Sequence, residues 1–273
     1  MEKLQAILSG ETYAEEFMGE RCAFIISLSF SQTNAPQAVE LEEFSAAIKR
    51  LDSAFKITDI ILSDTLNKHN ALIYYPQDDP EKKALELGNT WLEGPYYKAV
   101  ELKNVKLLVM RWQELLSEEN YPNVRQMSGH TYDSNEYFRA TVDFVCAKFV
   151  TFICDRRKKS LEKESFSDEP KRALTAPNFD PKKAYGCCLA YVLEECAATL
   201  MLRLKGYTNL FHLGKVNAAV NWVAKNPILC ASHSELNDAI NSKVLAVNTV
   251  SKYKPYQGST KSIEVPEVQL ELG

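Results

Sequence analysis

Polar side chains are few in the apolar stretch from Tyr185 to Leu204, and three of them are Tyr191, Glu194 and Glu195. The stretch has helical length and no proline, and a helix that is apolar on all sides is normally buried. Tyr191 and Glu195 would then lie about 5–6 Å apart on one helix face. A phenol beside a carboxylate can anchor a polar ligand. Alternatively, Glu195 bonds a neighbouring backbone group or arginine and is structural, because an unpaired buried charge is costly.

A second set of polar side chains follows two apolar runs of strand length, residues 22–29 and 57–62. Ser29 closes the first run, and Asp64 and His69 follow the second. In an open α/β sheet, ligands bind beyond the carboxyl ends of the strands. We therefore expect these side chains at the ligand-binding edge of the sheet.

The elements that would position these residues alternate between apolar runs and helical periodicity, which is typical of an α/β fold. We predict one Rossmann-like domain over residues 1–250, with a mostly parallel sheet flanked by helices, and an irregular tail over 251–273. The expected strands are 22–29, 57–62, 105–110, 209–213 and 244–250. The expected helices are 41–51, 80–92, 135–160, 185–204 and 216–224, whereas 117–135 looks rich in loops.

The composition describes an ordinary water-soluble chain of 273 residues with a net charge of −4. That charge gives no general signal for nucleic acid, so any such binding must come from a local patch. No run of 18 apolar residues is present, and the start lacks a charged segment followed by an apolar one. We expect neither a membrane span nor a secretory signal, and we expect the protein in the cytoplasm.

The seven cysteines are an odd number and lie mostly in apolar runs, which favours reduced, buried thiols. Cys187 and Cys188 diverge on a helix, and Cys196 would lie roughly 12 Å from Cys188 along the axis, too far for one tetrahedral zinc ion. Neither a glycine-rich phosphate loop nor a GxSxG turn occurs. We expect no metal site.

Five blocks, in order along residues 22–214, resemble the tRNA-dependent cyclodipeptide synthases. The family's serine strand is similar to F-I-I-S-L-S-F-S-Q, and its segment with Asp and His is similar to S-D-T-L-N-K-H-N. Two segments with Trp are similar to L-G-N-T-W-L and V-M-R-W-Q-E-L-L. The segment with the family's Tyr and Glu is similar to Y-V-L-E-E-C-A-A. Each block is weak alone, but chance does not readily give five in order.

The resemblance implies the fold of class I aminoacyl-tRNA synthetase catalytic domains without their ATP-binding motifs. It implies two aminoacyl-tRNAs as substrates and a cyclic dipeptide as product, made by a ping-pong route through an aminoacyl-serine. No metal or organic cofactor is implied, and we expect a monomer. An aminoacyl ester is already activated, so no ATP is needed for acyl transfer.

Carried over by position, the resemblance implies Ser29 as the nucleophile, with Ser27 as the next choice. Tyr191 and Glu195 match the residues that hold the α-amino group of the aminoacyl moiety, whereas Glu194 matches a position without that role. A carboxylate at this place can hold an ammonium group and then help to move its proton.

Other positions complete the implied site. The substrate-binding candidates are Gln32, Asp64, His69, Phe211 and His212, of which Asp64 and His69 suit a structural or tRNA-facing role better than a chemical one. The tRNA-binding candidates are Lys82, Lys83 and Lys98. A second basic run, Arg156 to Lys159, could also contact phosphates, although a solvated helix end accounts for it equally well.

The sequence also departs from the family pattern. Leu28 stands where the family has a glycine before the serine, and Ser31 replaces the glycine two residues after it. Phe211 replaces a tyrosine, so one hydroxyl is missing. The alternative hypothesis is a non-catalytic descendant that binds aminoacyl-tRNA. A third, an unrelated hydrolase using Ser29, lacks a His-Asp partner set.

Overall fold

The computed structural model describes residues 21–30, 44–45, 57–101, 109–161, 179–205, 207–213, 216–225 and 246–250. Gln32, most of the expected helix 41–51 and the expected tail 251–273 lie outside the described residues.

Five parallel strands form one sheet within the described part of the chain, in the order β3-β2-β1-β4-β5. Their bounds are β1 Arg21–Ser27, β2 Ile57–Ser63, β3 Val109–Arg111, β4 Tyr207–Leu213 and β5 Ala246–Val250. The prediction of a mostly parallel α/β sheet is confirmed. The order of the strands reverses between β1 and β4, and the carboxyl edge at such a reversal is where α/β folds bind ligands.

The helices alternate with these strands and cover both faces of the sheet. They are η1 Thr65–Asn67, α4 Lys68–Tyr74, α5 Pro80–Leu92, α6 Pro95–Glu101, α7 Trp112–Leu116, α8 Tyr121–Ser134, α9 Glu136–Leu161, α11 Pro181–Leu204 and α12 Ala218–Lys225. Asp79 caps α5 by accepting hydrogen bonds from the Glu81 and Lys82 amides, and Pro80 follows at the first helical position. This start signal explains why the expected bounds of α5 match the observed ones.

Helix α8 contradicts the expectation of a loop-rich segment over 117–135. Pro122 lies in the first turn, where the missing amide costs no hydrogen bond. The hydroxyls of Ser128 and Thr131 donate to the carbonyls of Val124 and Met127, four residues earlier. Residues that favour turns are thus satisfied within the helix, and their side chains face the core.

The two faces of the sheet pack against different parts of the chain. Ala23, Ile25 and Leu210 belong to a buried cluster with Ala198 and Leu202 of α11. Side chains alternate between the faces of a strand, so neighbouring residues in β1 point the other way. Phe24 contacts Phe44 there, with ring centroids 6.0 Å apart. Helix α11 therefore packs on one face of the sheet, over β1 and β4.

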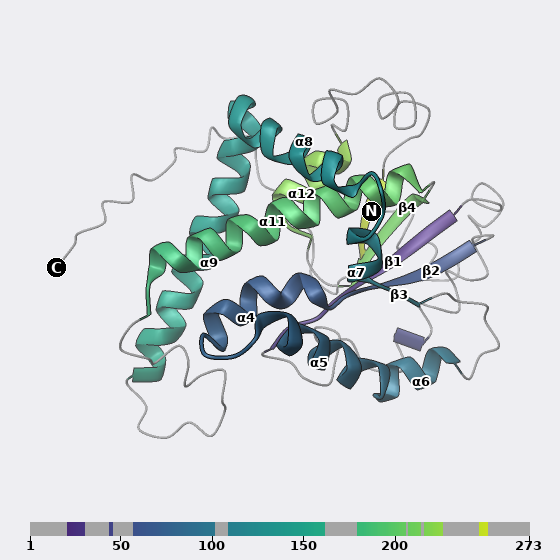
Figure 1. Ribbon diagram of the computed structural model, residues 1–273, viewed down its shortest axis with the longest axis horizontal. Helices are drawn as coiled ribbons and strands as arrows, with labels where there is room; N and C mark the ends of the chain where they lie inside the picture. The colour runs from purple at the N-terminus through teal and green to yellow at the C-terminus, as the bar shows by residue number, and fades with distance from the viewer. Residues whose placement is uncertain are drawn as a thin grey trace.

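Helix α11 crosses the molecule beside the ends of the strands, with α8 and α12 along one side and α4 along the other (Figure 1). It starts at Pro181, four residues before the expected start, because the Asp180 side chain accepts a hydrogen bond from the Lys182 amide. Most of its residues from Cys187 onward are buried. The expectation that this helix is buried is confirmed.

The core stripe of helix α9 differs from the expected one toward the C-terminal end of the helix. Phe138 and Val142 are fully buried and Phe149 is partly buried, as expected, but the Phe152 side chain is 51% exposed. Ile153 is buried instead. The expected positions repeat every 3.5 residues on average, and 3.6 residues per turn rotate such a repeat by about 20° per heptad, which moves the buried position from Phe152 to Ile153.

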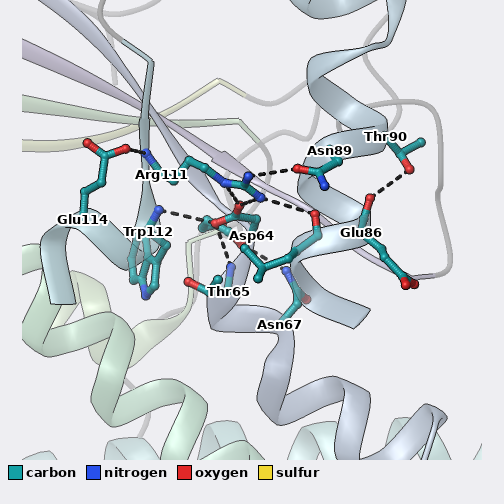
Figure 2. Close-up of polar contacts among 11 residues, drawn as sticks. Asp64, Thr65, Asn67, Glu86, Asn89, Thr90, Arg111, Trp112 and Glu114 are labelled. Atoms are coloured by element: carbon teal, nitrogen blue, oxygen red, sulfur yellow. Dashed lines mark hydrogen bonds and ion pairs between the residues drawn. The ribbon is translucent and has the colours of Figure 1, made fainter. Parts of the chain in front are cut away.

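A buried ion pair joins the ends of β2 and β3 to α5 (Figure 2). Asp64 is fully buried, and its carboxylate accepts hydrogen bonds from Arg111 Nε at 2.5 Å and from the Thr65 amide at 2.7 Å. Arg111 Nη1 also donates to Asn89 Oδ1 at 2.9 Å. The backbone amide of Trp112 lies 3.4 Å from Asp64 Oδ1, the oxygen that also accepts from the Thr65 amide. One carboxylate thus fixes the chain after two neighbouring strands.

Gly88 of α5 lies directly over this ion pair. A Cβ atom at Gly88 would be 2.4 Å from Asp64 Oδ2 and 2.7 Å from Arg111 Nη2. Both contacts are with side chains that are held by other hydrogen bonds, so neither side chain can move away without breaking some of those bonds. Glycine is therefore required for α5 to approach the strand ends this closely.

We predict that Gly88→Ala lowers the free energy of unfolding by about 2 kcal/mol or more, because overpacking a filled site costs roughly 1–3 kcal/mol. Urea unfolding measures this loss. Gly186→Ala is the matched control in a second helix, because a Cβ there meets nothing within 4 Å. That variant should gain about 0.5–1 kcal/mol from helix propensity. Equal effects of the two substitutions would contradict the packing argument.

Candidate active site

Two adjacent carboxylates of α11 reach opposite sides of the carboxyl edge of the sheet. Glu194 contacts residues that follow β2 and β3, whereas Glu195 contacts a residue that follows β4. Strand β1 lies between β2 and β4, and Ser29 comes two residues after its end. Ser29 therefore belongs to the strand end between the regions that the two carboxylates contact.

Glu194 is held by three donors. His69 Nε2 lies 3.0 Å and Lys68 Nζ 3.1 Å from Oε2, and Trp112 Nε1 donates to Oε1 at 3.2 Å. Burial alone would raise the pKa of Glu194. The hydrogen bond and charge of His69, together with the charge of Lys68, outweigh burial and hold the pKa below its usual value. Glu194 is an ionised anchor whose bonding capacity is largely used.

Glu195 has a different environment, although it is as buried as its neighbour. In the described part of the chain, Asn217 is its hydrogen-bond partner, with Nδ2 donating to Oε2. Burial raises the pKa of Glu195 to about 7, with the Asn217 hydrogen bond opposing the rise. A carboxyl group that is half ionised near neutral pH, with acceptor capacity left, can bind an ammonium group or exchange a proton.

Tyr191 lies one helical turn before Glu195 and is partly buried between the two core clusters that meet on α11. Burial, and next the charge of Glu195, raise the pKa of the Tyr191 phenol well above its usual value. The phenol therefore stays protonated at neutral pH and can donate a hydrogen bond. The predicted pairing of a phenol and a carboxylate on one helix face agrees with their spacing in α11.

Ser29 is half-buried just beyond β1, and Phe30 after it is buried. Ser27 is in register with Ser63 of β2, whose hydroxyl donates to the Ile26 carbonyl at 2.9 Å. The strand expected over 22–29 thus ends at Ser27. This leaves Ser29 at the edge where the sequence predicts a ligand site.

The structure separates the two adjacent residues Phe211 and His212 onto opposite faces of β4. His212 is in register with Ile25, on the face that packs against α11, and Phe211 is in register with Phe24 on the other face. Burial lowers the pKa of His212 to about 4, so it is neutral at pH 7. Phe211 is not brought to Tyr191 and Glu195, which gives no support to its predicted role in substrate binding.

Asp64 and His69 are both engaged within the protein. Asp64 is bound by Arg111, and His69 faces Glu194. Their arrangement agrees with the structural roles expected for them, and His69 reaches the site through Glu194. The predicted substrate-binding residue Gln32 lies outside the described residues.

The predicted tRNA-binding lysines lie on α5 and α6. Lys82 and Lys98 are exposed, but Lys83 pairs with Asp78 at 3.5 Å and with Glu86 at 3.4 Å. These carboxylates neutralise much of the charge that Lys83 could offer a phosphate. The surface of α5 therefore has little net positive charge.

Two contact residues of this site, Lys68 and Asn217, were not singled out from the sequence, whereas Trp112 was expected among the polar groups that follow a buried strand. Asn217 carries a local signal, because its Oδ1 accepts from the Val220 amide as an N-cap of α12. Its second role, as the donor to Glu195, depends on a contact across 22 residues of chain. The Glu194 contacts with Lys68 and Trp112 carry no local signal.

Within the described ranges, no group of His, Cys, Asp and Glu side chains is arranged to hold a metal ion. Nor does any helix in those ranges have both the length and the apolar character needed to cross a membrane.

Comparison with solved structures identifies proteins of the same fold. The chain is similar to a CDPS from Fluoribacter dumoffii, at 18% identity and a TM-score of 0.61, over 86% of this chain and 90% of that one. It is also similar to a cyclodipeptide synthase from Candidatus Glomeribacter gigasporarum bound to Phe-tRNAPhe, at 15% identity and a TM-score of 0.59, over 96% and 99%. A cyclo(L-leucyl-L-phenylalanyl) synthase matches at 13% identity and a TM-score of 0.52, over 76% and 82%.

No protein-family model matches the chain, and neither does any curated protein sequence. The similarity shown here is therefore one of fold. The resemblance to cyclodipeptide synthases seen in the sequence is confirmed at that level.

Glutamine substitutions at the two carboxylates should change stability in opposite directions at pH 8. The folded-state pKa of Glu195 is raised from 4.5 to about 7, so its ionisation opposes folding as pH rises through this window. Glu195→Gln should therefore stabilise the protein by about 3 kcal/mol above pH 7, and by little near pH 4.5. Urea unfolding at pH 5 and pH 8 measures the difference.

Glu194→Gln is the matched variant one residue away. The pKa of Glu194 is lowered, so its carboxylate stabilises the fold at any pH above its usual value, and this contribution is lost as pH falls through the lowered pKa. We expect a loss of about 2 kcal/mol at pH 8, because hydrogen bonds to a charged group are weakened. Destabilisation by both variants at pH 8 would show that Glu195 is held as a charged, paired group.

Proposed function

We propose that the protein is a tRNA-dependent cyclodipeptide synthase, which joins the amino acids of two aminoacyl-tRNAs into a cyclic dipeptide. The observation that carries this proposal is Glu195, a buried carboxyl group with a pKa of about 7 at the carboxyl edge of the sheet. It lies one turn from the Tyr191 phenol, in a fold shared with cyclodipeptide synthases.

The first step is transfer of an aminoacyl group to Ser29. The Ser29 hydroxyl oxygen attacks the ester carbonyl carbon, the bond from that carbon to the ribose oxygen breaks, and the ribose oxygen takes up a proton. One ester replaces another, so the step needs no ATP. The position of Ser29 beyond the central strand supports this role, because a ligand can approach there without crossing the core.

The second step uses the amine of a second aminoacyl-tRNA. That nitrogen attacks the carbonyl of the seryl ester, the bond to the Ser29 oxygen breaks, and a peptide bond forms. Attack of the remaining amine on the remaining ester then closes the ring. Each attack needs a neutral amine, so a group must remove a proton from the ammonium form.

Glu195 suits both demands on the amino group. Its carboxylate can hold the ammonium, which lowers the carboxyl pKa, and its burial raises that pKa again once the ammonium has lost its charge. The protonated Tyr191 phenol can donate to the substrate or to the carboxylate. Glu194 is bound by His69 and Lys68, so we assign it a positioning role.

A binding protein that makes no product is the second candidate. Leu28 in place of the family's glycine and the missing hydroxyl at Phe211 favour it. Such a protein would retain aminoacyl-tRNA without releasing a cyclic dipeptide. Expression in bacteria, followed by mass spectrometry of the medium, separates the two candidates.

Ser29→Ala should abolish both product and covalent labelling by a single radiolabelled aminoacyl-tRNA. Binding of tRNA should stay within about threefold, because a hydroxyl contributes little to ground-state affinity. Ser27→Ala is the control at the other serine of the strand and should retain the label. A labelled Ser29→Ala protein would instead make Ser27 the nucleophile.

Glu195→Gln should lower product formation at least about tenfold, equivalent to about 1.4 kcal/mol of transition-state stabilisation. The wild-type rate should rise with pH as the carboxyl group ionises, with a midpoint below about 7 because the bound ammonium lowers its pKa. The variant should lack this rise. A rate profile that is unchanged in the variant would exclude Glu195 as the group that handles the proton.

A further inference from the structure

A cationic corner forms where the end of α9 meets the start of α11. It consists of Arg156, Arg157 and Lys158 of α9 with Lys182 and Lys183 of α11, all exposed except Arg157, which is partly buried. Among the described residues from 155 to 158 and from 179 to 183, the acidic side chains are Asp155 and Asp180. Asp180 is used as the cap of α11. The corner therefore has a net positive charge, in a chain whose net charge is −4.

Packing makes the two halves of the corner one surface. The Arg157 guanidinium lies 5.1 Å from the centre of the Phe179 ring, just before α11. One turn back in α9, Ile153 belongs to a buried cluster with Ala184 of α11 and Ile73 of α4. The helix ends that carry the cations are thus held against each other and against α4, which follows β2.

An aromatic path connects the corner to Ser29. Phe30, the next residue, contacts both tyrosines at the end of α4, with centroid separations of 6.3 Å to Tyr74 and 5.1 Å to Tyr75. Burial raises the pKa of the Tyr74 phenol, and the neighbouring Arg156 guanidinium opposes that rise. Tyr74 therefore lies between Phe30 and the corner.

Lys82 and Lys83 of α5 lie in the first turn of their helix, as Lys182 and Lys183 of α11 do, one residue further from the capping aspartate. Each pair follows a capping aspartate and a proline within the first turn of its helix. The difference is in their partners, because Lys83 is paired with Asp78 and Glu86. No ion pair is found for Lys182 or Lys183 among the described residues.

We propose that the cationic corner, and not α5, binds the phosphate backbone of the substrate tRNA, with the single-stranded 3′ end passing over Tyr74 and Tyr75 to Ser29. The choice of tRNA as the ligand of this corner rests on the proposed function. Clustered cations bind phosphates, and aromatic faces stack on unpaired bases. Phe152, 51% exposed with Arg156 4.9 Å from its ring centre, adds a further stacking surface.

The test compares two matched double variants by fluorescence anisotropy with deacylated tRNA over a series of KCl concentrations. Lys182→Gln/Lys183→Gln should weaken binding about tenfold at 0.1 M KCl and reduce the salt slope by about 1.4–1.8, from roughly 0.7–0.9 per phosphate contact. Lys82→Gln/Lys83→Gln should change the affinity and the salt slope by no more than about half of the change seen in the α11 variant. Adding Arg156→Gln to the α11 variant should lower the salt slope by roughly a further 0.7–0.9, the value for one phosphate contact.

The outcomes distinguish failure of the tRNA-binding proposal from failure of the proposed enzyme activity. A wild-type protein that makes cyclic dipeptide while the α11 variant keeps its salt slope overturns the corner and leaves the function standing. A reduced slope in the α11 variant, without any product from the wild type, supports the corner and contradicts the synthase. Binding of phosphatidylserine vesicles through the corner, with tRNA binding unchanged in the variant, would assign it to a membrane and overturn the proposal.

Discussion

The buried ion pair between Asp64 and Arg111 fixes the edge of the sheet on which the candidate site is built. It joins the chain after β2 to the end of β3, and α5 approaches it closely at Gly88. Trp112, next in sequence, donates its backbone amide to Asp64 and its indole to Glu194. The contact of Trp112 with Glu194 therefore depends on the ion pair that holds the ends of β2 and β3 together. Breaking that contact would release strand ends and site together.

The two carboxylates of α11 show how one helix can supply groups with opposite properties. Glu194 and Glu195 are equally buried, yet Glu194 faces a lysine, a histidine and an indole while Glu195 faces one amide. Burial raises both pKa values, and only the first environment offsets the effect. An anchor and a proton-exchanging group can thus be neighbours in sequence, because a rotation of about 100° per residue directs them to different strands.

Prediction from sequence succeeded where local signals suffice. The Asp79–Pro80 start and the apolar period of α5 located that helix, and continuous apolar runs located β1 and β2. It failed for α8, whose serine, threonine, proline and glycine residues suggest loops but are satisfied within the helix. The polar residues of the candidate site were recognised as such, but not their partners. Glu194 and His69 are 125 residues apart, and no local pattern predicts a contact over that distance.

The indole of Trp112 has a consequence for how the site can be observed. It is almost completely buried, and its N–H points at Glu194. The emission of an indole depends on the electric field around the ring and on whether its N–H is bonded. Light emitted by this side chain therefore depends on the electric field at Glu194, and a change of charge beside that carboxylate alters the emission without any label.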